Sequence, residues 1–222
     1  MDGQLPNWTR NTTWRQGQVL GKDAVAALAL KHPSDADATC VVVISHDCDL
    51  ANDNLEVEPD VEVIVGRLVK NLDGNFSWGK APRILHVEAT REGTPVILEL
   101  AATAKRLVPK TALSAFTQDA SFELGHRGLL VMRSWLAVRY HRGAFPDPFV
   151  DRMRKHKLDK ALAKLVEPMG AVISVVFFDV DVGQELDHSD GSPYELNIVF
   201  VYAAGDDPDK AADTAEALEE SI

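Results

Sequence analysis

The chain contains little cysteine and no long apolar run. Only Cys40 and Cys48 occur among its 222 residues, which is too few for the disulfide framework of a small secreted domain. No apolar stretch approaches the roughly 20 residues that cross a bilayer. The first residues also lack the basic start and apolar stretch of a secretion signal. We therefore expect a soluble cytoplasmic protein with no membrane partner.

Several common functional motifs are missing as well. The sequence has no phosphate-binding Walker loop, no dinucleotide-binding glycine fingerprint and no serine-hydrolase elbow. It also has no closely paired His or Cys residues at the spacing of a metal site. No cofactor is expected from these patterns, and they assign no metal.

Positive charge is scarce overall but is concentrated in the middle of the chain. The 23 basic and 34 acidic residues give a net charge of −11. The net charge is −3 over residues 1–115, +4 over residues 116–170 and −12 over residues 171–222. A uniformly acidic protein would bind nucleic acid poorly. The basic middle segment keeps RNA or DNA open as a partner.

The first half of the chain has the pattern of a β-barrel or β-sandwich. The β-branched side chains within residues 39–45 follow one another without polar alternation, which is typical of a strand buried on both faces. Residues 61–69 alternate at first and predict a longer strand with one wetter face. Residues 83–87 and 95–100 predict two more strands, with a turn at residues 91–93. Short strands at this spacing favour a barrel or sandwich over βαβ units.

Beyond Pro109 the pattern changes to helices and a hairpin. The expected elements are helices over residues 110–116, 127–141 and 147–166, strands over 171–182 and 194–203, and a helix from Pro208. Asp147 and Asp207 are expected as helix caps. The fold class is therefore α+β, with a β-barrel domain over residues 1–115 and a helical plus β-hairpin region over residues 116–222.

The order of the N-terminal strands resembles that of the MazF/PemK-like toxin family. The similar segments are residues 17–20, 39–47, 61–65, 97–100 and 105–108. The resemblance implies an SH3-like β-barrel and ribonuclease chemistry. The family has an Arg before the apolar strand, but residues 34–38 are acidic here. Arg67 is the nearest candidate for a compensating cation.

The segment that leaves the apolar strand, Ser45-His46-Asp47-Cys48-Asp49, is the densest group of reactive side chains. Strand exits commonly carry functional groups. Cys48 could be a nucleophile activated by a histidine. His46, Asp47 or Asp49 could instead bind a divalent metal together with His86. The loop could also recognise RNA or a polar ligand, or its side chains could simply form turn contacts. The catalytic candidates are thus His46, Asp47, Cys48, Asp49 and Arg67.

Basic residues recur along the predicted helix over residues 147–166 and the helix before it. Arg152, His156, Lys160 and Lys164 are spaced four apart and would share one helix face. Such a face could bind phosphate groups, remain solvated, or pack against the acidic C-terminal part. The predicted nucleic-acid-binding residues are Arg139, Arg142, Arg152, Lys160 and Lys164.

The C-terminal part carries an acidic cluster at a strand end and loop. Spaced carboxylates can hold calcium or magnesium, but they also form solvated turns. The residues concerned are Asp179, Asp181, Glu185, Asp187 and Asp190.

Together these patterns predict a nucleic-acid-interacting or nuclease-like bacterial protein, in a toxin-type stress or antiviral defence system. The alternative is a non-catalytic interaction module whose charged C-terminal half docks a partner protein. A metal-dependent hydrolase that uses His46 and Asp49 is a third class. These patterns are common to enzymes and non-enzymes, and they predict no oligomeric state.

Overall fold

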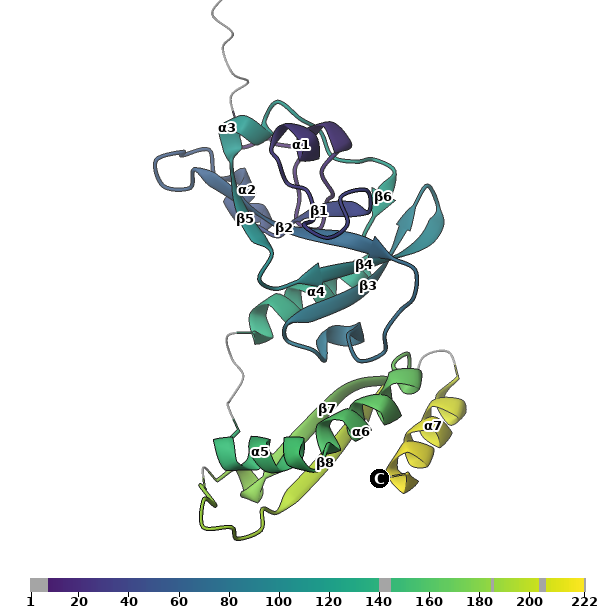
Figure 1. The fold of residues 1–222 in the computed structure, drawn as a ribbon. Helices are drawn as coiled ribbons and strands as arrows, with labels where there is room; N and C mark the ends of the chain where they lie inside the picture. The colour runs from purple at the N-terminus through teal and green to yellow at the C-terminus, as the bar shows by residue number, and fades with distance from the viewer. Residues whose placement is uncertain (1–7, 140–144, 185, 204–206, 222) are drawn as a thin grey trace, which may run out of the picture. The chain divides into compact units, whose positions relative to one another are not determined.

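The computed structural model describes residues 8–139, 145–184, 186–203 and 207–221. The chain forms two compact units (Figure 1). The first contains the residues up to Leu72 and Pro82–Leu136, and the second contains Asp73–Ala81 and the chain from Ala137 onward. No helix in the described ranges is long and apolar enough to cross a membrane.

The first unit is built on an antiparallel sheet that curls into a half-barrel (Figure 1). Its strands are β1 (Thr39–Val43), β2 (Asp60–Val69), β3 (Ile84–Arg91), β4 (Thr94–Ala101), β5 (Lys105–Pro109) and β6 (Phe122–Glu123). They lie in the order β1-β2-β4-β3-β6, and β5 pairs with β2. The first half of β2 pairs with β5 and its last residues pair with β4, so β2 links both parts of the curled sheet.

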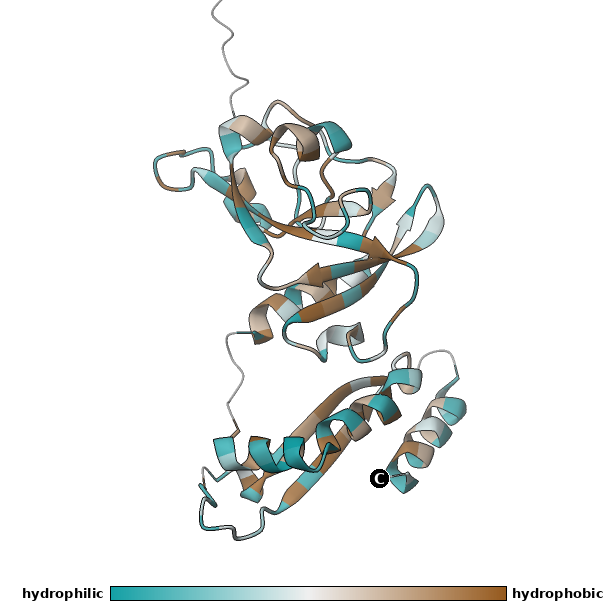
Figure 2. Ribbon diagram, in the orientation of Figure 1, coloured by the Kyte–Doolittle hydropathy of each residue, from teal (hydrophilic) through white to brown (hydrophobic). Residues whose placement is uncertain are grey.

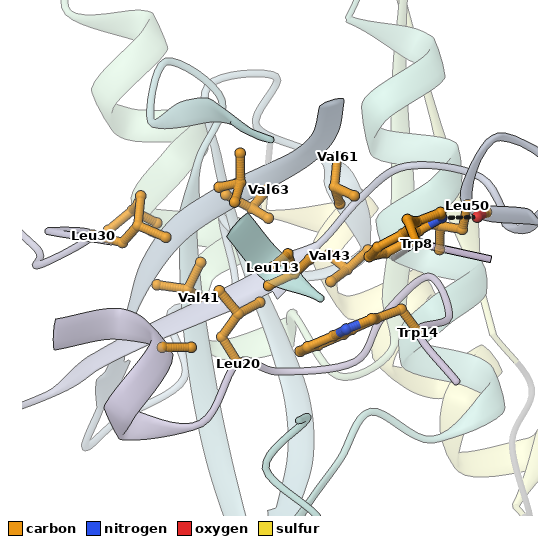
Figure 3. Close-up of a cluster of buried hydrophobic side chains, with 13 residues drawn as sticks. Trp8, Trp14, Leu20, Leu30, Val41, Val43, Leu50, Val61, Val63 and Leu113 are labelled. Atoms are coloured by element: carbon orange, nitrogen blue, oxygen red, sulfur yellow. Dashed lines mark hydrogen bonds between the residues drawn. The ribbon is translucent and has the colours of Figure 1, made fainter. Parts of the chain in front are cut away.

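Strand β1 is buried on both faces, as its unbroken apolar sequence predicts. Val41 and Val43 belong to one core cluster, which also contains Trp8 and Trp14 (Figure 3). Val42 and its neighbours Cys40 and Ile44 belong to a second cluster on the other side of the sheet. The predicted strands over the first hundred residues and the mixed helix-and-strand class are confirmed.

Four helices accompany this sheet: α1 (Lys22–Ala27), α2 (Asp47–Ala51), α3 (Lys110–Leu113) and α4 (His126–Val138). Helix α4 contributes the buried Met132 and Trp135 to the second core cluster. The first unit therefore continues to Leu136, beyond residue 115, where the barrel domain was expected to end.

The second unit is a two-stranded hairpin with helices packed on it. The hairpin consists of β7 (Ile173–Val180) and β8 (Leu196–Tyr202), and the helices are α5 (Asp147–Lys155), α6 (Leu158–Val166) and α7 (Pro208–Glu220). Single turns of 3₁₀ helix occur at η1 (Ser77–Gly79), η2 (Glu167–Met169) and η3 (Asp181–Gly183). The hairpin and the Asp207 cap, which accepts from the Lys210 amide at 3.1 Å, match the sequence prediction.

The prediction of one continuous helix over residues 147–166 is wrong. The chain breaks between α5 and α6 at Lys157, whose φ is +57° in the left-handed region. The break lets each helix bury its own apolar residue, Phe149 in α5 and Val166 in α6. The cap is also one residue earlier than predicted, because Pro146 is the N-cap and Asp147 is the first helical residue.

The segment Asp73–Ala81 joins the second unit through close backbone packing. A Cβ on Gly170 would lie 2.1 Å from the Cα of Gly74, so both positions require glycine. The Ser77 hydroxyl and the Trp78 indole N–H donate to the Gly170 carbonyl at 3.1 and 3.0 Å. The Phe76 amide donates to the Asp73 carbonyl at 3.0 Å, which closes a turn over residues 73–76.

Candidate functional site

The reactive loop after β1 forms a small cluster of exposed side chains. His46 is the N-cap of α2, and its Nδ1 accepts from the Cys48 amide at 3.3 Å. The same Nδ1 lies 2.9 Å from Cys48 Sγ, and Sγ lies 3.5 Å from an oxygen of Asp49. The structure therefore brings together three of the four polar residues predicted in this loop.

Asp47 points away from that cluster and serves as a structural link. Its Oδ1 accepts from the Gln16 amide at 2.8 Å. The Gln16 side chain in turn donates to the Ile44 carbonyl at 2.7 Å and accepts from Arg133 of α4. Asp47 thus connects the N-terminal segment to the residues that follow β1, a role that the sequence pattern did not indicate.

The side chain of Lys110 holds the C-terminal end of α2, and sequence reasoning missed this role. Its side chain is fully buried, and Nζ donates to the carbonyls of Asp49 and Asn52 at 2.6 and 2.9 Å. Burial lowers the pKa of Lys110, while nearby carboxylates such as Glu58 oppose that shift. Only the pairing of β5 with β2 brings Lys110 here, so no local signal could have identified it.

Arg67 lies at the other end of β1 from the reactive loop. It is paired with Thr39 at the start of the strand, whereas Val63 is paired with Val43 next to the loop. Successive strand residues rise about 3.3 Å each, so several residues of strand separate Arg67 from His46. The structure does not bring Arg67 into the loop cluster, contrary to the predicted joint centre.

Arg67 instead belongs to a row of polar residues across three strands. It faces Glu99 of β4, which faces His86 of β3. The Arg67 Nε donates to one Glu99 oxygen at 2.7 Å, and His86 Nε2 lies 3.0 Å from the other. The Arg–Glu–His row, meaning Arg67, Glu99 and His86, is thus held by side-chain hydrogen bonds from two neighbouring strands.

The row is partly accessible and electrostatically coupled. The side chains of Arg67, Glu99 and His86 are 33%, 19% and 5% exposed to solvent. Burial alone would raise the pKa of Glu99, but the hydrogen bonds and positive charge of its two partners outweigh burial and lower it. The hydrogen bond to Glu99 raises the pKa of Arg67. Glu99 is therefore an ionised carboxylate at neutral pH.

Gly66 permits the close approach of β2 and β4 that builds this row. A Cβ at Gly66 would lie 2.5 Å from the Glu99 carbonyl oxygen and 2.6 Å from the Leu100 side chain. Any larger residue would push β2 away from β4 next to Arg67. The row and Gly66 together form an organised polar site on the sheet of the first unit.

Basic side chains cover α5 and α6, although not as one helix face. Figure 2 shows hydrophilic colouring over most of α5. The exposed residues, called here the α5–α6 basic surface, are Arg154, Lys155, Lys157, Lys160 and Lys164. Within the described ranges its four lysines form no ion pair, and Arg154 only approaches Asp151 at 3.9 Å.

The other predicted nucleic-acid-binding arginines have different surroundings. Arg152 donates to the carbonyls of His188 and Ser192, and its guanidinium lies 4.9 Å from the Tyr194 ring centre. It therefore packs against the acidic C-terminal part, one of the alternatives left open by the sequence. Arg139 follows α4 and is half-buried, and Arg142 lies outside the described residues.

Within the described part of the acidic cluster, Asp181 and Asp190 make hydrogen bonds to residues of the same loop. Asp181 is buried and accepts from the Glu195 amide at 3.0 Å, and its other oxygen lies 3.1 Å from His188 Nε2. His188 Nδ1 also contacts the Ser192 hydroxyl. Glu185 lies outside the described residues. Among the residues that the structure describes, no group of three or more His, Cys, Asp or Glu side chains is placed to hold a metal ion.

Comparisons with known proteins add no assignment, because no family model, curated protein or solved structure matches this chain.

Proposed function

We propose that this protein is a nucleic-acid-interacting, nuclease-like bacterial protein that cleaves RNA at the Arg–Glu–His row. The proposal includes an SH3-like barrel of the MazF/PemK-like kind and a role in toxin-type stress or antiviral defence. The observation that carries it is the row itself, in which a carboxylate bonds a guanidinium at 2.7 Å and an imidazole at 3.0 Å. A base, an acid and a cation are the groups that phosphodiester cleavage requires.

The chemistry assigns one role to each member of the row. Glu99 takes the proton from the ribose 2′-hydroxyl, and the 2′-oxygen attacks the adjacent phosphorus. The bond from phosphorus to the 5′-oxygen breaks, and protonated His86 gives its proton to that leaving oxygen. Arg67 stabilises the negative charge that builds on the phosphate oxygens. The products are a 2′,3′-cyclic phosphate and a free 5′-hydroxyl.

The α5–α6 basic surface supports nucleic acid as the substrate class. Its lysines are exposed and unpaired within the described ranges, in a chain whose net charge is −11. Residues that contact phosphates release counterions, so binding falls steeply as salt rises. The lysines would bind the RNA backbone irrespective of sequence.

An RNA cleavage assay with matched variants tests this proposal. Glu99→Gln and His86→Asn remove the base and the acid, and we expect each to reduce cleavage by about 100-fold or more. Glu62→Gln is the control, because it removes an exposed carboxylate from the same sheet at a position outside the row. Thermal melting checks that the variants fold. Absence of RNA cleavage by the folded wild type would overturn the proposal, as would full activity of Glu99→Gln.

A second candidate function is the non-catalytic interaction module. It is favoured by one observation, that Phe177 and Val199 are cross-strand partners on β7 and β8 and are 58% and 52% exposed. Exposed apolar neighbours of this kind often mark protein contacts. Here we expect a stable complex with a partner protein that Phe177→Ser weakens and Glu99→Gln leaves unchanged.

A further inference from the structure

The second unit contains an apolar pocket beneath α5 and α6. Its volume is about 440 Å³, within the range of sites for small molecules. The helices contribute Phe149 and Leu162, and the hairpin contributes Val176, Phe178 and Phe200. The pocket therefore lies between the helices and the hairpin, and Arg154 of the α5–α6 basic surface also lines it.

Aromatic rings form one wall of this pocket. The Phe145 ring lies 5.4 Å from the Phe149 ring and 6.2 Å from the Phe178 ring, measured between centres. Tilted and edge-to-face contacts of this kind fix ring positions. The wall gives the pocket a defined apolar surface for an alkyl chain or a ring.

One lysine lines the pocket without an anionic partner. Lys80 is half-buried, and its Nζ donates to the carbonyls of Ile173 and Gly170 at 2.6 and 3.4 Å. In the described part of the chain no carboxylate lies within 4.0 Å of that nitrogen. Burial lowers the pKa of Lys80 to about 8, against the opposing charge of Asp73. A cation removed from water without a counter-ion is costly.

The other charged groups at the pocket are Arg154 and Asp159. Arg154 lies 3.9 Å from Asp151 in an exposed pair within α5. Lys80 and Arg154 are thus the cations that line the pocket and Asp159 is the carboxylate, while Asp73 lies near enough to Lys80 to oppose the shift of its pKa. This combination matches a ligand with an apolar body and one negative group.

We propose that this pocket binds an apolar monocarboxylate, with the chain or ring among the phenylalanines and the carboxylate at Lys80. Burial of the apolar body supplies the driving force. The ligand carboxylate supplies the direct ion pair that Lys80 does not make with any carboxylate of the described residues, and charge-assisted hydrogen bonds of this kind are the strong ones. A neutral ligand of the same shape would leave the lysine uncompensated. The proposal is independent of RNA cleavage.

Calorimetric titration with decanoate and decanol tests this inference. We expect saturable decanoate binding at concentrations up to about 1 mM and weaker binding of decanol. Lys80→Met keeps the length of the side chain and removes its charge, so decanoate should bind about tenfold or more weakly. Lys164→Met is the matched control, because Lys164 lies on α6 but does not line the pocket.

A pH series on the unchanged protein provides a second readout, which does not depend on whether a variant folds. The other charged groups that face Lys80 and the pocket are Asp73, Asp159 and Arg154. Lys80 loses its proton between about pH 7 and pH 9.5, so decanoate affinity should fall while decanol affinity stays constant. Absence of decanoate binding, equal binding of decanol, or an unchanged affinity in both Lys80→Met and the pH series would overturn the proposal.

Discussion

At the scale of single residues, neighbours across strands decide what each side chain can do. Glu99 is an ordinary strand residue in the sequence, yet Arg67 and His86 bond both of its oxygens. Cys40 and Cys48 are chemically identical, yet one is buried and the other exposed. These differences lead to two predictions at this scale.

The first concerns the two cysteines. Burial raises the pKa of the Cys40 thiol to about 12, although Arg91 opposes the shift. Cys48 is exposed, with its Sγ 2.9 Å from His46 Nδ1. Because the thiolate is the reactive form, iodoacetamide should label Cys48 in the folded protein and leave Cys40 unlabelled until denaturant is added. Mass spectrometry of the labelled peptides measures this, and equal labelling of both in the native state would contradict the structure.

The second concerns Glu99 and acid. Its pKa is lowered in the folded state by Arg67 and His86, so the ion pairing stabilises the protein above the ordinary glutamate pKa of about 4.3. That contribution is lost as the pH falls through the lower folded value. We expect the wild type to exceed Glu99→Gln in unfolding free energy by roughly 1 kcal/mol at pH 7, given partial exposure. The difference should shrink at acid pH in urea titrations, and a constant difference would count against the pairing.

At the scale of elements, the sequence patterns predict the strands correctly but do not predict the break between α5 and α6. The β-branched run at β1 predicts a doubly buried strand, because no polar residue interrupts residues Cys40–Ile44. The break at Lys157 has no comparable signal, since neither glycine nor proline marks it. The tertiary packing of Phe149 and Val166 selects two helices where the periodicity alone favours one.

The left-handed conformation of Lys157 leads to a prediction about protein stability. A left-handed conformation strains a residue with a side chain but not glycine, so Lys157→Gly should stabilise the protein by about 0.5–1 kcal/mol. In a continuous helix the same change would cost about 1 kcal/mol. Lys160→Gly within α6 is the control and should be destabilising. Urea unfolding of both variants measures the effect, and loss of stability in Lys157→Gly would support the continuous helix.

At the scale of the whole molecule, charge is separated along the chain, and long-range pairing assembles the candidate site. The sequence indicated His46, Cys48 and Asp49 as a local group, because they are adjacent. The sequence patterns indicated His86 as a metal partner of the loop after β1 and Arg67 as a compensating cation, and they gave Glu99 no role. The register of β2, β3 and β4 places Arg67, Glu99 and His86 next to one another, and Gly66 permits the close approach of β2 and β4. The three residues therefore come together only in the folded sheet.

The central claim is that the Arg–Glu–His row cleaves RNA through the 2′-hydroxyl. The most direct measurement compares one RNA oligonucleotide with the same oligonucleotide fully 2′-O-methylated, followed by mass spectrometry of the ends. We predict that wild-type protein cuts only the unmodified RNA and leaves a 2′,3′-cyclic phosphate, and that Glu99→Gln is inactive. Equal cutting of both oligonucleotides, or no cutting of either by folded protein, would contradict the account.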